Sequence, residues 1–163
     1  MVEFRILGPL EVIEQERALP LGGAKQRALL AVLLLHRREV VSTDRLIDHL
    51  WGERPPATAA KTVQVYISRL RKTLGADLVV THGRGYVLAA EPDQVDLDRF
   101  GELAAEGRRA LEEGEPGRAS RRLREALALW RGPPLADLAY EPFAQTEIGG
   151  ARGGAARRAR GSD

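Results

Sequence analysis

The sequence predicts an α+β fold, in which a small antiparallel sheet and three helices end in a β-hairpin and are followed by an all-helical segment. Three observations support this prediction. Apolar residues alternate with polar ones near the N terminus, three runs with helical periodicity precede a β-rich stretch around HGRG, and two further amphipathic runs follow residue 96. The length of 163 residues and the hydrophobic fraction of 44% suit one ordinary domain or two small ones.

The charge changes sign along the chain, and this change predicts two domains. Residues 1–90 hold 13 Lys and Arg against 9 Asp and Glu, residues 91–148 hold 8 against 13, and residues 149–163 hold 4 against 1. A basic module suits an anionic partner, whereas an acidic module suits contacts with protein. We therefore expect domains at 1–90 and 96–148, a linker at 91–95 and a disordered basic tail at 149–163.

The N-terminal stretch VEFRILGPLEVI is expected to form short strands joined by turns, because its apolar positions alternate around a Gly-Pro pair. The candidates for its buried face are Phe4, Ile6, Val12 and Ile13. The run AKQRALLAVLLLHRR that follows is rich in Ala and Leu and apolar around most of its circumference. We therefore expect it to be a largely buried core helix.

A second, shorter helix is predicted within VVSTDRLIDHLWGERPP. Ser42 suits its N-cap, Asp44 favours its first turn, and Gly52 followed by two prolines ends it. The apolar residues that fall on one face of this helix are Leu46, Ile47, Leu50 and Trp51.

A third helix, beginning near residue 57 or 58, is predicted by apolar residues at helical spacing. Its buried stripe consists of Val63, Ile67, Leu70 and Leu74. Its opposite face carries Lys61, Val65, Ser68, Arg69 and Lys72, flanked by Thr62, Tyr66, Gln64 and Arg71. After this helix, two β-rich runs on either side of residues 82–85 predict a hairpin with a basic tip.

The exposed face of the third helix mixes basic, hydroxyl and aliphatic side chains. The major groove of DNA accepts an α-helix and offers guanine acceptors to Arg and thymine methyls to aliphatic groups, while nearby phosphates suit Lys, Ser, Thr and Tyr. A solvated face on an ordinary amphipathic helix is the alternative. Three features favour DNA: the outward valine, the basic hairpin, and the short preceding helix that completes a helix-turn-helix.

Two sets of motifs carry a resemblance to known families. The runs VQVYISRLRKTLG and VVTHGRGYVL resemble the third helix and wing of OmpR-type winged-helix DNA-binding domains. Together with FRILGPLEV, LGGAKQRALLAVLLLH, VVSTDRLIDHLWGERPPATA and EALALWRGPPLADL, they are similar to the Streptomyces antibiotic regulatory protein (SARP) family. The resemblance implies a transcriptional activator: a winged helix-turn-helix with an N-terminal antiparallel sheet and a C-terminal hairpin wing, followed by an all-α, tetratricopeptide-like bacterial transcriptional activation domain.

The resemblance implies a role for each exposed residue of the third helix. Arg69 and Val65 would approach base edges of double-stranded DNA. Phosphates or groove walls would be contacted by Lys61, Tyr66, Ser68, Arg71 and Lys72, with Thr58 and Thr62 completing the set near the helix start. In the wing, His82 or Arg84 would reach the minor groove or its phosphates, and Tyr86 would brace the hairpin or meet a phosphate.

The resemblance also implies partners beyond DNA. Family members are thought to bind direct repeats beside a promoter and to touch RNA polymerase, so we expect self-association on tandem sites. Glu53 and Arg54 lie in the loop between the second and third helices, which matches the segment through which OmpR-type domains are said to meet polymerase. A plain turn is the alternative interpretation of this loop.

The second domain is predicted to be an αα-hairpin, because DLDRFGELAAEGRRALEEG and PGRASRRLREALALWRG are amphipathic and Pro116 suits a first helical turn. By resemblance, the tetratricopeptide positions are Leu103, Gly107, Ala110, Ala119, Leu123 and Ala126. The family places further helices after LADLAYEPFAQTEI, whereas the sequence continues as GGARGGAARRARGSD. We hypothesise a frameshift after Ile148 that leaves a partial activation domain; a solvated tail or a non-specific grip on DNA are alternatives.

Several classes of function are excluded. The chain has no cysteine, and its three histidines, His36, His49 and His82, are scattered, so no metal site is indicated. GGAKQR departs from a phosphate-binding loop and no catalytic constellation is found, so we predict neither an enzyme nor a cofactor. Without a long apolar run or a leader, we expect a cytoplasmic protein with no membrane partner. The alternative function is a protein-interaction module that uses the tetratricopeptide-like helices, with DNA binding lost or non-specific.

Overall fold

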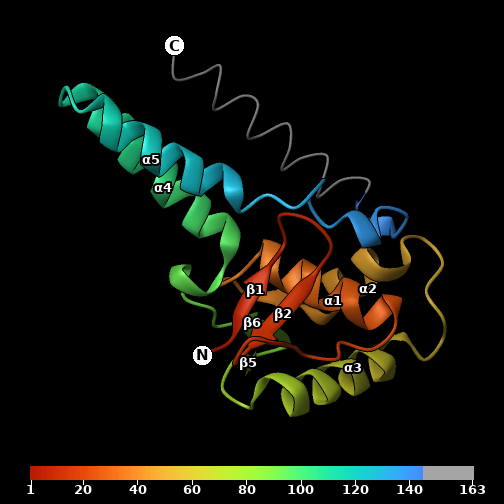
Figure 1. Ribbon diagram of the computed structural model, residues 1–163. Coiled ribbons are helices and arrows are strands. Elements are labelled where there is room, and N and C mark those ends of the chain that lie inside the picture. Colours follow the sequence, from red (N-terminus) through yellow and green to blue (C-terminus); the bar gives the residue numbers. More distant parts are fainter. Residues whose placement is uncertain (145–163) are drawn as a thin grey trace. The chain divides into compact units, whose positions relative to one another are not determined.

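The computed structural model describes residues 1–144 (Figure 1). These residues divide into two compact units. The sheet–hairpin unit combines Met1–Leu19 with Ala90–Asp137. The helix–wing unit combines Pro20–Ala89 with residues 138–144. Residues 1–19 therefore group with the helical hairpin rather than with the three-helix part, which differs from the grouping expected. The division into functional domains at 1–90 and 96–148 stays a prediction.

The first sheet lies in the sheet–hairpin unit, with antiparallel strands in the order β1-β2-β3. The strands are β1 (Glu3–Arg5), β2 (Glu11–Glu14) and β3 (Arg17–Ala18). Phe4 pairs with Val12, both are fully buried, and Ile6 is buried directly after β1. The expectation that Ile13 shares this face is wrong: it is only half-buried, because successive residues of a strand point to opposite sides.

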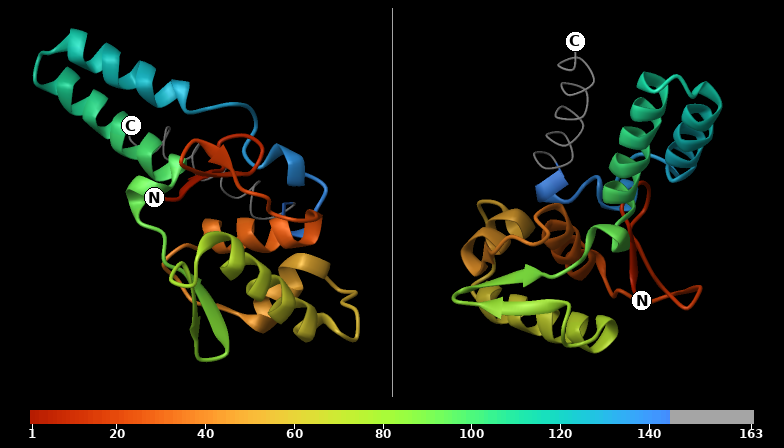
Figure 2. Two further views of the ribbon diagram at one scale, coloured as in Figure 1. Left: turned by 60° about the horizontal axis from the view of Figure 1, so that its bottom comes forward. Right: turned by 90° about the vertical axis from the view of Figure 1, so that its left-hand side faces the viewer.

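The helical hairpin of this unit consists of α4 (Asp96–Glu112) and α5 (Pro116–Ala128), which run side by side in opposite directions (Figure 2). Pro116 occupies the first turn of α5, as predicted. A Cβ at Gly107 would lie 2.8 Å from Leu123, so the absence of a side chain at 107 lets the two helices approach closely. The small and large residues buried along this contact are Leu103, Ala110, Ala119 and Ala126. The predicted αα-hairpin is therefore confirmed.

The segment 91–95, expected to be a linker, is packed into the sheet–hairpin unit. Residues Pro92–Gln94 form a 3₁₀-helix, and the buried Gln94 side chain joins the Glu91 amide at 2.9 Å to the Val2 carbonyl at 3.1 Å. Val95 is buried and bridged to Phe4 in the parallel sense. Its polar composition resembles that of a linker because the Val2 carbonyl that holds Gln94 lies 92 positions away and is not visible locally.

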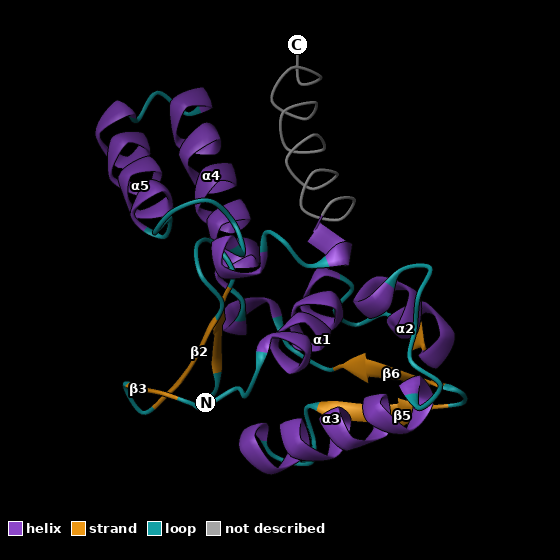
Figure 3. Ribbon diagram, turned by 90° about the vertical axis from the view of Figure 1, so that its right-hand side faces the viewer, coloured by secondary structure: helices purple, strands orange, loops and turns teal. Residues whose placement is uncertain are grey.

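The helix–wing unit contains three helices and a second antiparallel sheet in the order β4-β6-β5 (Figure 3). Its elements are α1 (Ala24–Leu35), β4 (Val41–Ser42), α2 (Thr43–Trp51), α3 (Ala59–Leu74), β5 (Val79–His82) and β6 (Gly85–Leu88). Seven consecutive residues of α1, 28–34, are buried, so it is the core helix expected. Helix-turn-helix and hairpin follow in the predicted order, which confirms the winged helix-turn-helix.

The helix ends match the local signals of the sequence. The Ser42 hydroxyl accepts a hydrogen bond of 3.1 Å from the Arg45 amide, which caps α2 as predicted. Gly52 ends α2 with a φ of 62°, a conformation that favours glycine. The predicted buried stripe of α3, namely Val63, Ile67, Leu70 and Leu74, is buried.

Residues 138–144, which we call the return segment, belong to the helix–wing unit although they follow the helical hairpin. Leu138 and Phe143 are buried, and Glu141 pairs with Lys25 at 2.9 Å. The Lys25 ammonium also donates to the Leu50 carbonyl at the end of α2. The predicted tail 149–163 and the proposed frameshift after Ile148 lie outside the described residues. Within residues 1–144, no helix is long and apolar enough to cross a membrane.

Candidate nucleic-acid interface

Helix α3 carries its predicted polar face outward. Opposite the buried stripe, the exposed residues are Lys61, Gln64, Val65, Ser68, Arg69 and Lys72. Val65 has 39% of its surface exposed, which places an aliphatic group among the charges, as the periodicity predicts. Thr62 and Tyr66 lie at one edge of this face and are half-buried. More than a third of this valine is open to solvent, so its position suits contact with an apolar group such as a thymine methyl.

The cations of this surface have no acidic partners within the described chain. Lys61, Arg69 and Lys72 on α3 and Arg84 at the hairpin tip make no ion pair with any carboxylate of residues 1–144. Arginines of the helical hairpin behave differently: Arg122, for example, pairs with Glu106 at 3.0 Å. The positive charge on α3 and on the tip of the β5–β6 hairpin is therefore not neutralised locally, and it attracts polyanions.

The β5–β6 hairpin, the wing, carries His82 and Arg84 exposed at its tip. Gly83 has a φ of 58°, which favours glycine in the turn. A Cβ on Gly85 would lie only 2.5 Å from the Val41 carbonyl oxygen, so glycine allows β6 to approach β4. Thr43, the first residue of α2, donates both its backbone N–H and its hydroxyl to the Arg84 carbonyl at 3.0 Å. The tip is therefore attached to the start of α2.

Arg71 joins α3 to this hairpin. Its Nε donates to the Val79 carbonyl at 2.9 Å, and its Nη2 donates to the Thr81 hydroxyl at 2.7 Å. The guanidinium also lies 5.8 Å from the centre of the Tyr86 ring. The resemblance placed Arg71 on a phosphate or groove wall, whereas the structure places it between the helix and the wing. Thr81 and Thr43 were missed because their partners lie 10 and 41 positions away in the chain.

An open hollow lies between α3 and the wing. Its lining residues are Gln64, Ile67, Ser68, Arg71, Lys72, Ala76 and Tyr86. Hydroxyl, amide and ammonium groups surround it, and these are the groups that bind phosphate oxygens in protein–DNA complexes. Thr58, Glu53 and Arg54 lie apart from the hollow, exposed in the connection between α2 and α3.

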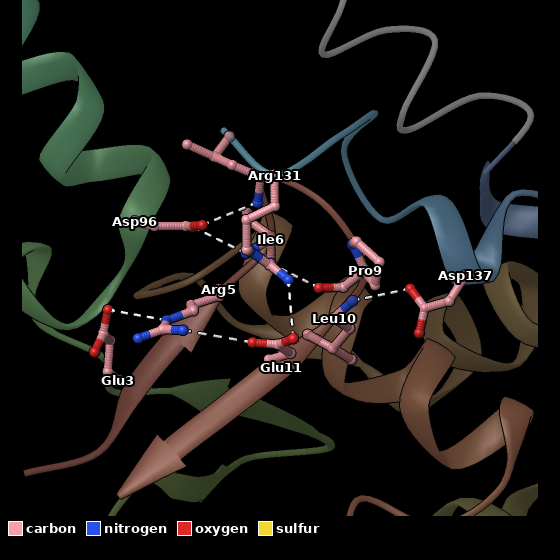
Figure 4. A network of polar contacts seen from close by, with 10 residues as sticks. Glu3, Arg5, Ile6, Pro9, Leu10, Glu11, Asp96, Arg131 and Asp137 are labelled. Atoms are coloured by element: carbon pink, nitrogen blue, oxygen red, sulfur yellow. Dashed lines mark hydrogen bonds and ion pairs between the residues drawn. The ribbon is translucent and has the colours of Figure 1, made fainter. Parts of the chain in front are cut away.

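A second polar cluster, in the sheet–hairpin unit, serves the fold and was not found from the sequence (Figure 4). The two carboxylate oxygens of Asp96 accept hydrogen bonds from the amides of Ile6 at 2.9 Å and Leu7 at 3.0 Å. Burial raises the pKa of Asp96, while hydrogen bonds from Ile6, Leu7 and the Leu97 amide, and the charge of Arg131, partly offset this rise.

Arg131 and Asp137 hold the rest of the same loop. The Arg131 guanidinium donates to the Pro9 carbonyl at 2.7 Å and pairs with Glu11 at 3.2 Å, and Asp137 accepts from the Leu10 amide at 2.9 Å (Figure 4). The signal for this cluster was the joint presence of FRILGPLEV and LWRGPPLADL, the two segments that it connects.

Comparison with protein families gives two matches. Residues 17–88 match the family described as "Transcriptional regulatory protein, C terminal", and residues 95–152 match the "Bacterial transcriptional activator domain". The first match covers the helix–wing elements described above. The second begins just before α4 and covers the helical hairpin.

Two similar proteins are named as regulators. The transcriptional regulatory protein MoaR1 of Mycobacterium tuberculosis is 45% identical over 151 residues, which cover 88% of this chain and 49% of MoaR1. The regulatory protein AfsR of Streptomyces coelicolor is 39% identical over 147 residues, which cover 90% of this chain and 15% of AfsR. The chain thus spans about half the length of MoaR1 and much less of AfsR.

A solved structure supports the fold assignment. The structure of Mycobacterium tuberculosis EmbR in complex with a low-affinity phosphopeptide superposes with a TM-score of 0.87 at 36% identity, covering 92% of this chain and 41% of EmbR. The matched families and relatives are transcriptional regulators rather than enzymes. With its OmpR-type domain followed by a bacterial transcriptional activator domain, the chain belongs to the SARP family of transcriptional regulators.

Proposed function

We propose that the chain is a sequence-specific DNA-binding regulator, an activator that binds direct repeats near promoters and contacts RNA polymerase. One observation carries the DNA-binding part of this proposal. The outward face of α3 combines three cations that have no ion pair within residues 1–144 with an exposed valine, beside a hairpin tip that carries a fourth such cation. This mixture suits a major groove and its phosphates.

The residues of α3 divide into base-reading and phosphate-binding groups. Arg69 and Val65 lie on the exposed face, where an arginine fork suits guanine O6 and N7 and an aliphatic group suits a thymine methyl. Lys61, Ser68 and Lys72 suit phosphates on either side of the groove. The remaining candidates, at the start and edge of the helix, are Thr58, Thr62 and Tyr66.

The wing suits an adjacent stretch of the same DNA. Arg84 and His82 project at its tip, where they can reach the minor groove or its phosphates. Tyr86 lies under the Arg71 guanidinium and lines the hollow, so it braces the hairpin and offers its hydroxyl to a phosphate.

The activation part of the proposal rests on family membership and on an exposed loop. Glu53 and Arg54 are exposed between α2 and α3 and make no ion pair within the described residues, so both are available to RNA polymerase. Binding to direct repeats brings neighbouring copies together on DNA, which is where self-association would occur. Such a regulator works in the cytoplasm, together with the chromosome.

Selection of bound sites from random double-stranded DNA tests this function. We expect recovered sequences to contain a recurrent motif, present as tandem copies, and affinity to fall steeply as salt is raised. Ser68→Asp introduces a negative charge on the exposed face of α3 and should abolish recovery of the motif. Ser120→Asp places the same charge on the exposed face of α5 and should leave recovery of the motif unchanged. Recovery of random sequences by the wild-type chain would favour a protein-interaction module instead.

A further inference from the structure

We propose that Arg71 is a positioning residue that fixes the wing against α3. The inference rests on the proposed DNA-binding function and deepens it. Arg71 contacts both strands of the hairpin: it donates to Val79 and Thr81 on β5, at 2.9 and 2.7 Å, and lies over the ring of Tyr86 on β6. A side chain that served a phosphate alone would have no need of these contacts.

The shape of the guanidinium explains why arginine stands at this position. Its donors lie in one plane with fixed directions, and its flat face stacks on aromatic rings. At residue 71 one edge reaches the Val79 carbonyl and the Thr81 hydroxyl while the cation stays near the Tyr86 ring. A lysine would keep the charge, but its single ammonium does not reproduce the planar fork over the ring.

The strand register carries this attachment to the wing tip. Thr81 pairs directly with Tyr86, and a single residue pair separates them from the turn that contains Arg84. On the other side of the hairpin, Thr43 donates two hydrogen bonds to the Arg84 carbonyl. The tip is therefore held from α3 through Arg71 and from α2 through Thr43.

This attachment matters for binding because β4 pairs with β6, which leaves β5 with a strand partner on one side only. β5 is one of the two edge strands of its sheet, and Arg71 donates two hydrogen bonds to it from α3. Without Arg71, the wing tip has more conformations in the free protein, and Arg84 must lose more freedom when it meets DNA. Arg71 thus raises affinity through Arg84.

Four variants of the full chain test the inference on a DNA site recovered by selection. We expect Arg71→Ala and Arg71→Lys each to weaken binding by about tenfold, the effect of losing one or two charge-assisted hydrogen bonds. Thr81→Val removes the hydroxyl that accepts from Arg71 but no charge, and it should also weaken binding. Lys72→Ala, one residue along α3, is the matched control for loss of charge. Thermal melts verify that each variant is folded.

A double-mutant cycle with Arg84→Ala identifies the route. If Arg71 acts through the wing, Arg71→Ala weakens binding much less in the Arg84→Ala background than in the wild type. Lys72→Ala should weaken binding equally in both backgrounds. The inference is overturned if Arg71→Lys binds like the wild type, Thr81→Val has no effect, and Arg71→Ala and Arg84→Ala are additive.

Amide hydrogen exchange in the free protein separates this inference from the proposed function. Arg71→Ala should speed exchange of the β5 and β6 amides by about tenfold and leave α1 unchanged. If the wild type binds no DNA but Arg71→Ala speeds exchange of the β5 and β6 amides, the proposed function fails and the positioning role stands. Unchanged exchange in β5 and β6 overturns the positioning role whether or not DNA is bound.

Discussion

Asp96, the first residue of α4, accepts a hydrogen bond of 2.9 Å from the amide of Ile6, 90 positions earlier in the chain. Its second oxygen accepts from Leu7 at 3.0 Å, so the whole carboxylate is used. The helical hairpin is thereby joined to the loop between β1 and β2 through a buried side chain. The carboxylate offers a separate acceptor oxygen to each of the two buried amides and brings no donor to the site when it is ionised.

Asp96→Asn should destabilise the sheet–hairpin unit by about 1–3 kcal/mol, because the amide side chain keeps one acceptor and turns an NH₂ group toward the other backbone N–H. Chemical denaturation followed by circular dichroism measures the loss. Glu102→Gln, at an exposed position of the same helix, is the control and should change stability by less than about 0.5 kcal/mol. Equal stability of the two variants would mean that the Asp96 contacts are not needed.

The same carboxyl predicts a pH dependence. The pKa of Asp96 is raised in the folded state above its ordinary value of 3.8, mainly by burial. Its contribution to stability is therefore full below the unfolded pKa and is lost as pH rises through the folded pKa. The difference in free energy of unfolding between the wild type and Asp96→Asn should decrease as pH rises from the unfolded pKa to the folded pKa of Asp96. Urea titrations of both proteins at closely spaced pH values check this, and a difference that increases with pH contradicts the direction.

Arg69→Ala should weaken binding to the cognate site by roughly 1–3 kcal/mol and flatten the preference at one or two base pairs. Lys72→Ala should weaken binding to all sequences about equally and reduce the salt dependence, because it removes a phosphate contact. Binding measured in parallel to a library of single-base variants of the site distinguishes these effects. Identical sequence profiles for the two variants would refute the assignment of Arg69 to a base.

Ile67→Asp should unfold the helix–wing unit, because Ile67 is only 2% exposed and the substitution buries an unpaired charge. Ser68→Asp, at the next position, should leave the melting temperature nearly unchanged, because this side chain is exposed, and should abolish DNA binding by repelling phosphates. Thermal melts and gel shifts of both variants provide the measurement. Similar melting temperatures would contradict the register of α3.

What could be predicted from the sequence depends on how local the signal is. The stripe that includes Ile67 and the cap at Ser42 are encoded within a few residues, so periodicity and capping rules were sufficient. The same periodicity identified the exposed face that carries Val65, because a helix with a known buried side has a known outer side.

The contacts that the sequence does not reveal depend on partners outside the local segment. Arg71 has the same spacing as an exposed cation, and only the β5 strand shows that its guanidinium is engaged. Asp96 begins α4, and only the fold shows that its carboxylate accepts from the Ile6 amide, 90 positions earlier in the chain. Ile13 differs from these cases, because it lies next to Val12 in β2 and the two side chains point to opposite sides of the strand.

The return segment and the N-terminal strands have a consequence for dissection of the protein. Each compact unit is built from two separate stretches of chain, and these stretches alternate along the sequence. A single cut at residue 90 would leave β1 and β2 without Asp96, and would leave Lys25 without Glu141. Neither half of such a cut contains all the residues of one unit. Fragments for separate study should therefore be spliced, joining 1–19 to 90–137 and 20–89 to 138–144 through short flexible linkers.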